Sequence, residues 1–82
     1  MTMRNFVEKM MAFGFTYEAA HDEINYGKYD QYDHESGLHV LVFDDGGMVL
    51  TNPSMDTICE HEPGEDLTML TEIKDIIDGM QG

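Results

Sequence analysis

Three of the four histidines in this chain have acidic neighbours, in the segments His21-Asp22-Glu23, Asp33-His34-Glu35 and Glu60-His61-Glu62. Adjacent carboxylates favour the charged form of an imidazole. Together with the single cysteine, Cys59, these side chains are of the types that bind zinc or another divalent ion. Cys59 and His61, however, are separated by one residue rather than the usual roughly two to four, and a second cysteine pair is missing. The sequence therefore predicts no metal site and no cofactor.

The sequence also lacks the motifs of calcium-binding loops, phosphate-binding loops and nucleophilic active sites. Neither acidic stretch, residues 30–37 or 44–47, has the alternating carboxylates, glycine and terminal glutamate of a calcium-binding EF-hand loop. The two serines lack the surroundings of a nucleophile elbow, and the sequence has no glycine-rich phosphate loop. Cys59 lies beside Glu60 and near Glu62, whose charges oppose formation of a thiolate. The protein is predicted not to be an enzyme.

The composition is strongly acidic, with 17 Asp and Glu against 4 Lys and Arg in 82 residues and a net charge of -13. Nucleic acids and anionic membranes attract basic surfaces, so neither is an expected direct partner. Solubility needs a net charge of only about 2 to 8 in magnitude. The excess indicates a basic protein partner, and the alternative is a solvated surface adapted to salt or to an acidic proteome.

The charge is concentrated in the middle of the chain, because residues 18–66 carry -12, whereas residues 1–17 carry +1 and residues 67–82 carry -2. Carboxylates at alternate strand positions lie about 6.6 Å apart on one side, and can face the rows of Lys and Arg that grip DNA. An arginine of a partner can stack on a tyrosine ring in a cation–π contact. Packing of the tyrosines on the sheet is an equally favoured alternative. The predicted contact residues are Asp22, Glu23, Asp30, Asp33, Glu35, Asp44, Asp45, Tyr29 and Tyr32.

Two amphipathic helices are predicted to flank this acidic region. The first has a possible N-cap at Thr2 and a left-handed stop at Gly14, and its apolar stripe is Met3, Phe6, Val7, Met10 and Phe13. The second follows Pro63-Gly64 with Asp66 as its N-cap, and its stripe is Leu70, Ile73, Ile76, Ile77 and Met80. Both stripes are expected to pack against a common core.

Between the helices the sequence predicts an antiparallel sheet. Residues 38–43 and 48–51 flank Asp44-Asp45-Gly46-Gly47, a strong hairpin signal, and a turn at 34–37 joins them to a strand around 28–33. Residues 15–21 fit a strand or a short helix, and a strand is favoured. The predicted fold is one α+β domain over residues 1–82: a helix, a meander of three strands, or four with residues 15–21, and a helix packed on one face.

The hairpin register determines which side chains face the helices. A two-residue turn at Asp45-Gly46 would pair Phe43 with Met48 and Leu41 with Leu50 on the helix-facing side. The opposite face would then carry Val40, Val42 and Val49. Residues 52–62, expected to be irregular, are the favoured cover for this face, and the alternative is contact with a second copy.

The sequence also favours a location in the cytoplasm. A single cysteine cannot form an intrachain disulfide, the N-terminal stretch lacks the unbroken apolar run of a signal peptide, and the longest apolar run elsewhere is residues 40–43.

The whole profile, a compact α+β chain of this length and charge, resembles the small inhibitors that bacteriophages make against host defence. These include acidic uracil-DNA-glycosylase inhibitors, anti-restriction proteins and DNA-mimicking anti-CRISPR proteins, which occupy the nucleic-acid-binding or PAM-reading site of a Cas effector. No single motif carries the resemblance, so it assigns no residues. It implies a monomeric or homodimeric inhibitor acting in the host cytoplasm, by mimicry or by allosteric locking. The alternatives are a self-associating structural or adaptor protein and, less favoured, a metal-binding domain.

Overall fold

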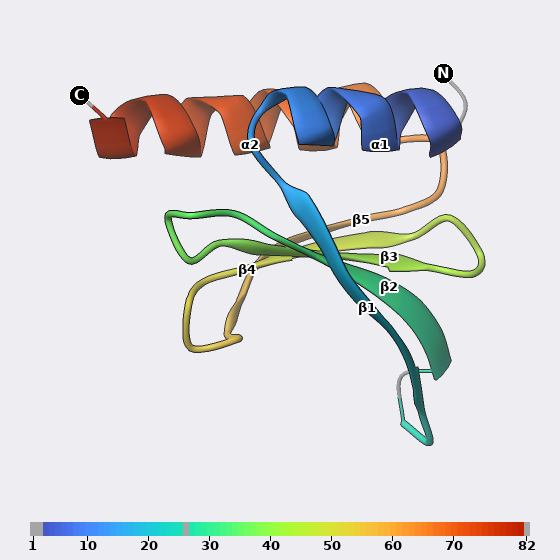
Figure 1. The fold of residues 1–82 in the computed structure, drawn as a ribbon. Helices are drawn as coiled ribbons and strands as arrows, with labels where there is room; N and C mark the ends of the chain where they lie inside the picture. The colour runs from blue at the N-terminus through green and yellow to red at the C-terminus, as the bar shows by residue number, and fades with distance from the viewer. Residues whose placement is uncertain (1–2, 26, 82) are drawn as a thin grey trace.

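The computed structural model describes residues 3–25 and 27–81, so the predicted N-cap at Thr2 lies outside the described residues. In chain order the elements are α1 (Met3–Ala12), β1 (Thr16–Glu23), β2 (Gly27–Asp33), β3 (His39–Phe43), β4 (Met48–Thr51), β5 (Thr57–His61) and α2 (Asp66–Gln81). The strands form one antiparallel sheet in the order β1-β2-β3-β4-β5, and both helices lie on the same face of it (Figure 1). The predicted α+β class is confirmed, with more strands than expected.

The first helix forms as its apolar spacing predicts. Phe6 and Met10 are fully buried beneath it. After the helix the chain turns at Gly14, whose φ of 104° favours glycine, and the Phe15 N–H donates to the Met10 carbonyl at 3.1 Å. The predicted stop at Gly14 is confirmed, and Phe15, which follows it, is only 2% exposed and belongs to the core.

The second helix begins at Asp66, and the Met69 N–H donates to the Glu65 carbonyl at 3.0 Å. Its buried apolar side chains are Met69, Leu70, Ile73 and Ile77, and Asp66 is buried at its start. Met80, predicted as part of the stripe, is 53% exposed because the C-terminal end of α2 extends beyond α1 (Figure 1). Neither helix of the described residues is long and apolar enough to cross a membrane.

The predicted register of the β3–β4 hairpin is wrong by one residue. Gly46, with φ 93°, donates its N–H to the Phe43 carbonyl at 2.9 Å, and the Phe43 N–H donates to the Gly47 carbonyl at 2.8 Å. The loop is therefore a three-residue turn that ends in a left-handed glycine. Val42 pairs with Met48 as a result, and a shift of one residue turns each β3 side chain to the other face.

This shift changes which valines are buried. Val40 is fully buried and Val42 is 7% exposed, and both face the helices together with Met48 and Leu50. The opposite face, called here the open face, carries Leu41, Phe43 and Val49 instead. The predicted self-association surface of Val40, Val42 and Val49 is thus wrong, because two of its three members belong to the core.

Of the two edge strands, β1 confirms the favoured prediction and β5 departs from it. Residues 15–21, for which a strand was favoured over a helix, lie mostly in β1, and β5 occupies part of the stretch expected to be irregular. Each edge strand carries one extra residue relative to its neighbour, Glu18 in β1 and Ile58 in β5. The inward side chains of β5 are Cys59 and His61, so its sequence lacks the apolar alternation that marks a strand.

The loop between β4 and β5 covers one end of the open face. The Asn52 side-chain oxygen accepts hydrogen bonds from the N–H groups of Ser54 and Asp56, at 3.0 and 2.9 Å, and these bonds hold the loop in shape. Thr51 donates its hydroxyl to the Met55 sulfur at 3.8 Å. In Figure 1 this yellow loop lies on the side of the sheet away from the helices. The predicted cover over the second face is therefore partial.

Candidate functional site

Four of the predicted contact residues lie at one end of the sheet, the end that carries the β1–β2 and β3–β4 turns. Asp22 pairs with Lys28 across β1 and β2, and the Asp44 N–H donates to the Lys28 carbonyl at 3.2 Å, so Lys28 links the two turns. The four exposed carboxylates here are called the acidic end and consist of Asp22, Glu23, Asp44 and Asp45.

The carboxylates of the acidic end form no ion pair with a lysine or arginine among the described residues, although Lys28 lies opposite Asp22 in the sheet. Among the described residues, the ion pairs of arginine and lysine are Arg4–Glu8 at 3.4 Å and Lys74–Asp78 at 3.0 Å, both within the helices. The carboxylates of the sheet and turns pair only with histidines in the described part of the chain. The acidic end is consequently a solvent-facing group of carboxylates that carry no lysine or arginine ion pair in the described part of the chain.

The remaining predicted acidic residues lie elsewhere. Glu35 is in the turn at residues 34–37, at the opposite end of β2 and β3 from the acidic end. Asp30 pairs with Val42, whose side chain faces the helices, whereas Asp33 pairs with His39 on the open face. The structure therefore does not bring all the predicted contact residues into one surface.

Asp30 and Tyr32 lie on the helix-facing side of β2. The Tyr17 hydroxyl donates to the Asp30 carboxylate at 3.2 Å, and the Tyr17 ring meets the Tyr32 ring edge-on at 5.4 Å. Tyr32 is 7% exposed and belongs to the core. Burial, followed by the Asp30 charge, raises the pKa of Tyr32. Of the two roles considered for the tyrosines, Tyr32 therefore has the one of packing on the sheet, and little of its surface is left for a partner.

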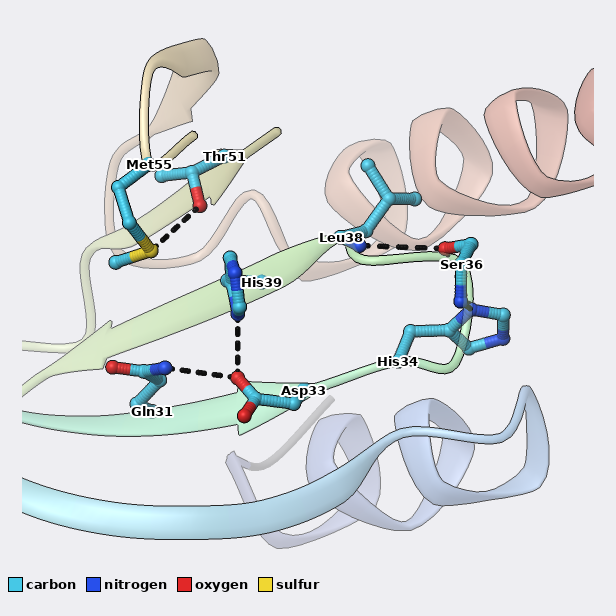
Figure 2. A network of polar contacts seen from close by, with 8 residues as sticks. All are labelled: Gln31, Asp33, His34, Ser36, Leu38, His39, Thr51 and Met55. Atoms are coloured by element: carbon cyan, nitrogen blue, oxygen red, sulfur yellow. Dashed lines mark hydrogen bonds and ion pairs between the residues drawn. The ribbon is translucent and has the colours of Figure 1, made fainter. Parts of the chain in front are cut away.

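Asp33 is engaged in a hydrogen-bond network on the open face (Figure 2). Its carboxylate lies 2.6 Å from Nδ1 of His39 and accepts a bond from the Gln31 amide at 2.9 Å. Burial alone would raise the pKa of Asp33, but the hydrogen bonds from Gln31 and His39 outweigh it and hold the pKa below its usual value. One oxygen of the Asp33 carboxylate is thus engaged in contacts within the chain and is less available to a partner.

His34, another histidine with acidic sequence neighbours, is structural. It is 8% exposed, and its Nε2 donates to the Phe13 carbonyl at 3.0 Å. Its Nδ1 accepts the Ser36 N–H at 3.1 Å and lies 2.8 Å from the Ser36 hydroxyl. These contacts tie the β2–β3 turn to the residue that follows α1, and both ring nitrogens are occupied. Figure 2 shows His34 beside Ser36 in this turn.

The open face contains a groove of about 480 Å³ next to the acidic end. It is lined by Tyr29, Leu41, Phe43, Val49, Thr51, Met55, Thr57 and the carboxylates Glu23 and Glu60. Tyr29, predicted as a contact residue, lies between the rings of His21 and Phe43, 5.0 and 5.3 Å away, and its hydroxyl donates to Glu23 at 3.2 Å. The sequence prediction missed this groove because the predicted hairpin register, wrong by one residue, placed Leu41 and Phe43 on the helix-facing side.

A second group of polar side chains lies between β5 and α2. Cys59, His61 and Glu72 bring one sulfur, one nitrogen and one oxygen within 4.8 Å of one another. Burial, and then the hydrogen bond to Glu72 and its charge, raise the pKa of the Cys59 thiol to about 12. Hydrogen bonds from Cys59 and His61 lower the pKa of Glu72. The sequence prediction missed Glu72 because it is eleven residues beyond His61 and in another element.

Comparison of the chain with protein-family models, with curated proteins and with solved structures gives no match.

Proposed function

We propose that this chain is a non-enzymatic inhibitor that binds the basic nucleic-acid-binding surface of a partner protein as a mimic of nucleic acid. The observation that carries the proposal is the acidic end, where Asp22, Glu23, Asp44 and Asp45 are exposed without a paired lysine or arginine among the described residues. Asp22 and Glu23 end β1, and Asp44 and Asp45 follow β3; these two strands lie two places apart in the sheet, a separation on the order of 10 Å. Fixed carboxylates with this spread suit several cationic side chains at once.

The groove on the open face supports the same type of partner. It is apolar along Leu41, Phe43 and Val49, and Glu23 and Glu60 also line it. A segment with an apolar side chain between lysines or arginines matches this combination. A second copy of the chain is disfavoured as the occupant because each copy carries a net charge of -13.

The resemblance to phage-encoded DNA mimics narrows the proposed partner. A Cas effector or another nucleic-acid enzyme of a bacterial defence system presents the basic channel that such an inhibitor would block. Steering between opposite charges would make association fast and dependent on salt.

The test is capture from a bacterial lysate on immobilised protein, followed by elution with duplex DNA. We expect the captured proteins to bind nucleic acids and to be released by DNA and by high salt. The variant Asp22→Asn, Glu23→Gln, Asp44→Asn should capture at least about tenfold less of them. Asp45 is left intact because its side chain accepts the Gly47 N–H at 2.8 Å and shapes the turn.

A control variant, Glu8→Gln, Asp75→Asn, Asp78→Asn, removes the same number of negative charges, three, from the helices. All three positions are exposed, and surface ion pairs such as those of Glu8 and Asp78 contribute little to stability. The control should capture as much as the native chain. Equal losses in both variants, or captured proteins that duplex DNA does not release, would contradict the proposal.

A further inference from the structure

We propose that Cys59, His61 and Glu72 form a binding site for one zinc ion between β5 and α2. Cys59 and His61 are two positions apart on β5, so both side chains leave the same face of the sheet, toward α2. Glu72 reaches them from α2, and the three candidate ligand atoms lie within 4.8 Å of one another. Thiolate, imidazole and carboxylate are the three ligand types of zinc in proteins, and this mixture disfavours calcium and magnesium, which take oxygen ligands.

A second feature of the cluster also points to a metal. Histidines that bind metals usually present their other ring nitrogen to a carboxylate, which orients the ring. Nε2 of His61 faces Glu72 at 2.7 Å, and its Nδ1 lies 3.8 Å from the Glu65 carboxylate, within ion-pair range but longer than a hydrogen bond, so Glu65 must approach slightly to orient the ring. Glu65 is itself held by the Glu62 N–H, which donates to its carboxylate at 2.7 Å. The His61 side chain is only 10% exposed, so its orientation is set before any ion arrives.

Binding requires a small adjustment of the side chains. Ligand bonds of about 2.0 to 2.3 Å in a tetrahedral site separate the ligand atoms by roughly 3.3 to 3.8 Å. The 2.7 Å contact between His61 and Glu72 must therefore open by somewhat less than about 1 Å. The side chain of Glu72 is 40% exposed, which leaves it room to move when its hydrogen bonds are exchanged for the ion, and water can supply the fourth ligand there. As the zinc–sulfur bond forms, the Cys59 thiol releases its proton to the solvent.

A zinc ion here would link the last strand to the last helix of a small domain that has no disulfide. Domains of this size bury little surface, and a ligand that binds only the folded chain stabilises it. At a free zinc concentration of 100 times Kd, the melting temperature should rise by roughly 15 °C. The site faces the helices and its test needs no partner protein, so this inference stands apart from the proposed function.

The experiment uses untagged, chelator-treated protein, titrated with zinc by calorimetry and with cobalt by absorption spectroscopy. We expect one zinc per chain and, with cobalt, a charge-transfer band that reports a bond to the thiolate. Cys59→Ser should abolish the band, and Glu72→Gln should weaken zinc binding by at least about tenfold. Asp75→Asn is the matched control, since it removes the same charge from an exposed position of the same helix and should bind zinc as the native chain does.

If Cys59→Ser fails to fold, the proposal is still tested by two measurements. These are the cobalt charge-transfer band of the native chain and the zinc affinity of Glu72→Gln. Absence of one-to-one zinc binding would overturn the proposal and leave the cluster as a hydrogen-bond network. Equal affinities for Glu72→Gln and Asp75→Asn would also overturn it, because the ion would then be held by the acidic surface in general.

Discussion

Among the single residues, Asp33 and Cys59 are held in opposite protonation states by their neighbours. Asp33 is kept ionised by Gln31 and His39, whereas Cys59 is kept protonated by burial and by Glu72. Each effect links a local contact to a measurable property of the whole chain, because a pKa that differs between folded and unfolded states makes stability depend on pH.

We predict that Asp33→Asn lowers the free energy of unfolding by about 1 kcal/mol at neutral pH, because it weakens hydrogen bonds to a charged acceptor. The pKa of Asp33 lies below its ordinary value of 3.8 in the folded chain. Its contribution is therefore fully present above that value and is lost as the pH falls through the lowered, folded-state pKa. Urea unfolding of both proteins from about pH 7 to about pH 3 should show the difference shrinking toward acid.

The control for this measurement is Glu35→Gln. Glu35 is exposed in the neighbouring turn, and its replacement removes the same charge without touching the Asp33 network. A loss of stability as large as that of Asp33→Asn would show that overall charge, not the network, is responsible.

We also predict that the Cys59 thiol is slow to react in the folded chain. With a pKa of about 12, its thiolate fraction near pH 8 is on the order of 10³-fold below that of an unperturbed cysteine. Labelling with a thiol reagent in the presence of chelator should be slower by about this factor in native than in urea-unfolded protein. Glu72→Gln should accelerate the native reaction, and similar rates for native and unfolded chains would exclude the buried, hydrogen-bonded thiol.

Among the elements, the β3–β4 turn determines which face of β3 is buried. Gly46 has φ 93°, and a Cβ there would lie 3.3 Å from the Pro63 side chain. We predict that Gly46→Ala lowers the free energy of unfolding by about 1 to 2 kcal/mol, since alanine is strained in this backbone conformation. Equilibrium unfolding in urea measures the change.

The same substitution at Gly79 is the control for the turn. Gly79 lies in α2 with no atom within 4 Å of an added Cβ, so Gly79→Ala should stabilise the chain by about 0.5 to 1 kcal/mol. Changes of the same sign at both positions would contradict the role of the left-handed turn.

The sequence predicts the elements well where their side chains alternate clearly and fails where two turn lengths compete. The helix stripes around Phe6 and Ile73 and the stop at Gly14 follow from spacing alone. An Asp-Gly pair, however, suits both a two-residue and a three-residue turn, and only packing of Val40 against the helices selects the latter. Glu72 joins Cys59 through tertiary contact, which spacing along the chain does not encode.

On the scale of the whole molecule, the net charge of -13 opposes the compact state. We predict that added sodium chloride raises the urea midpoint at neutral pH, because salt screens the repulsion among exposed carboxylates. Near the isoelectric point, at about pH 4.2, the same salt series should have little effect. A midpoint that does not change with salt at neutral pH would show that the crowded charges do not strain the fold.

The extra residues in β1 and β5 have a consequence for molecules that meet in solution. A regular outer strand offers its free N–H and C=O groups as a template for another chain, and sheets that lack protection grow into aggregates. Glu18 and Ile58 interrupt that template at each margin, and the carboxylates of Glu18 and Glu60 add like-charge repulsion there. An open sheet of this kind can therefore remain dispersed at high concentration while its broad face stays available.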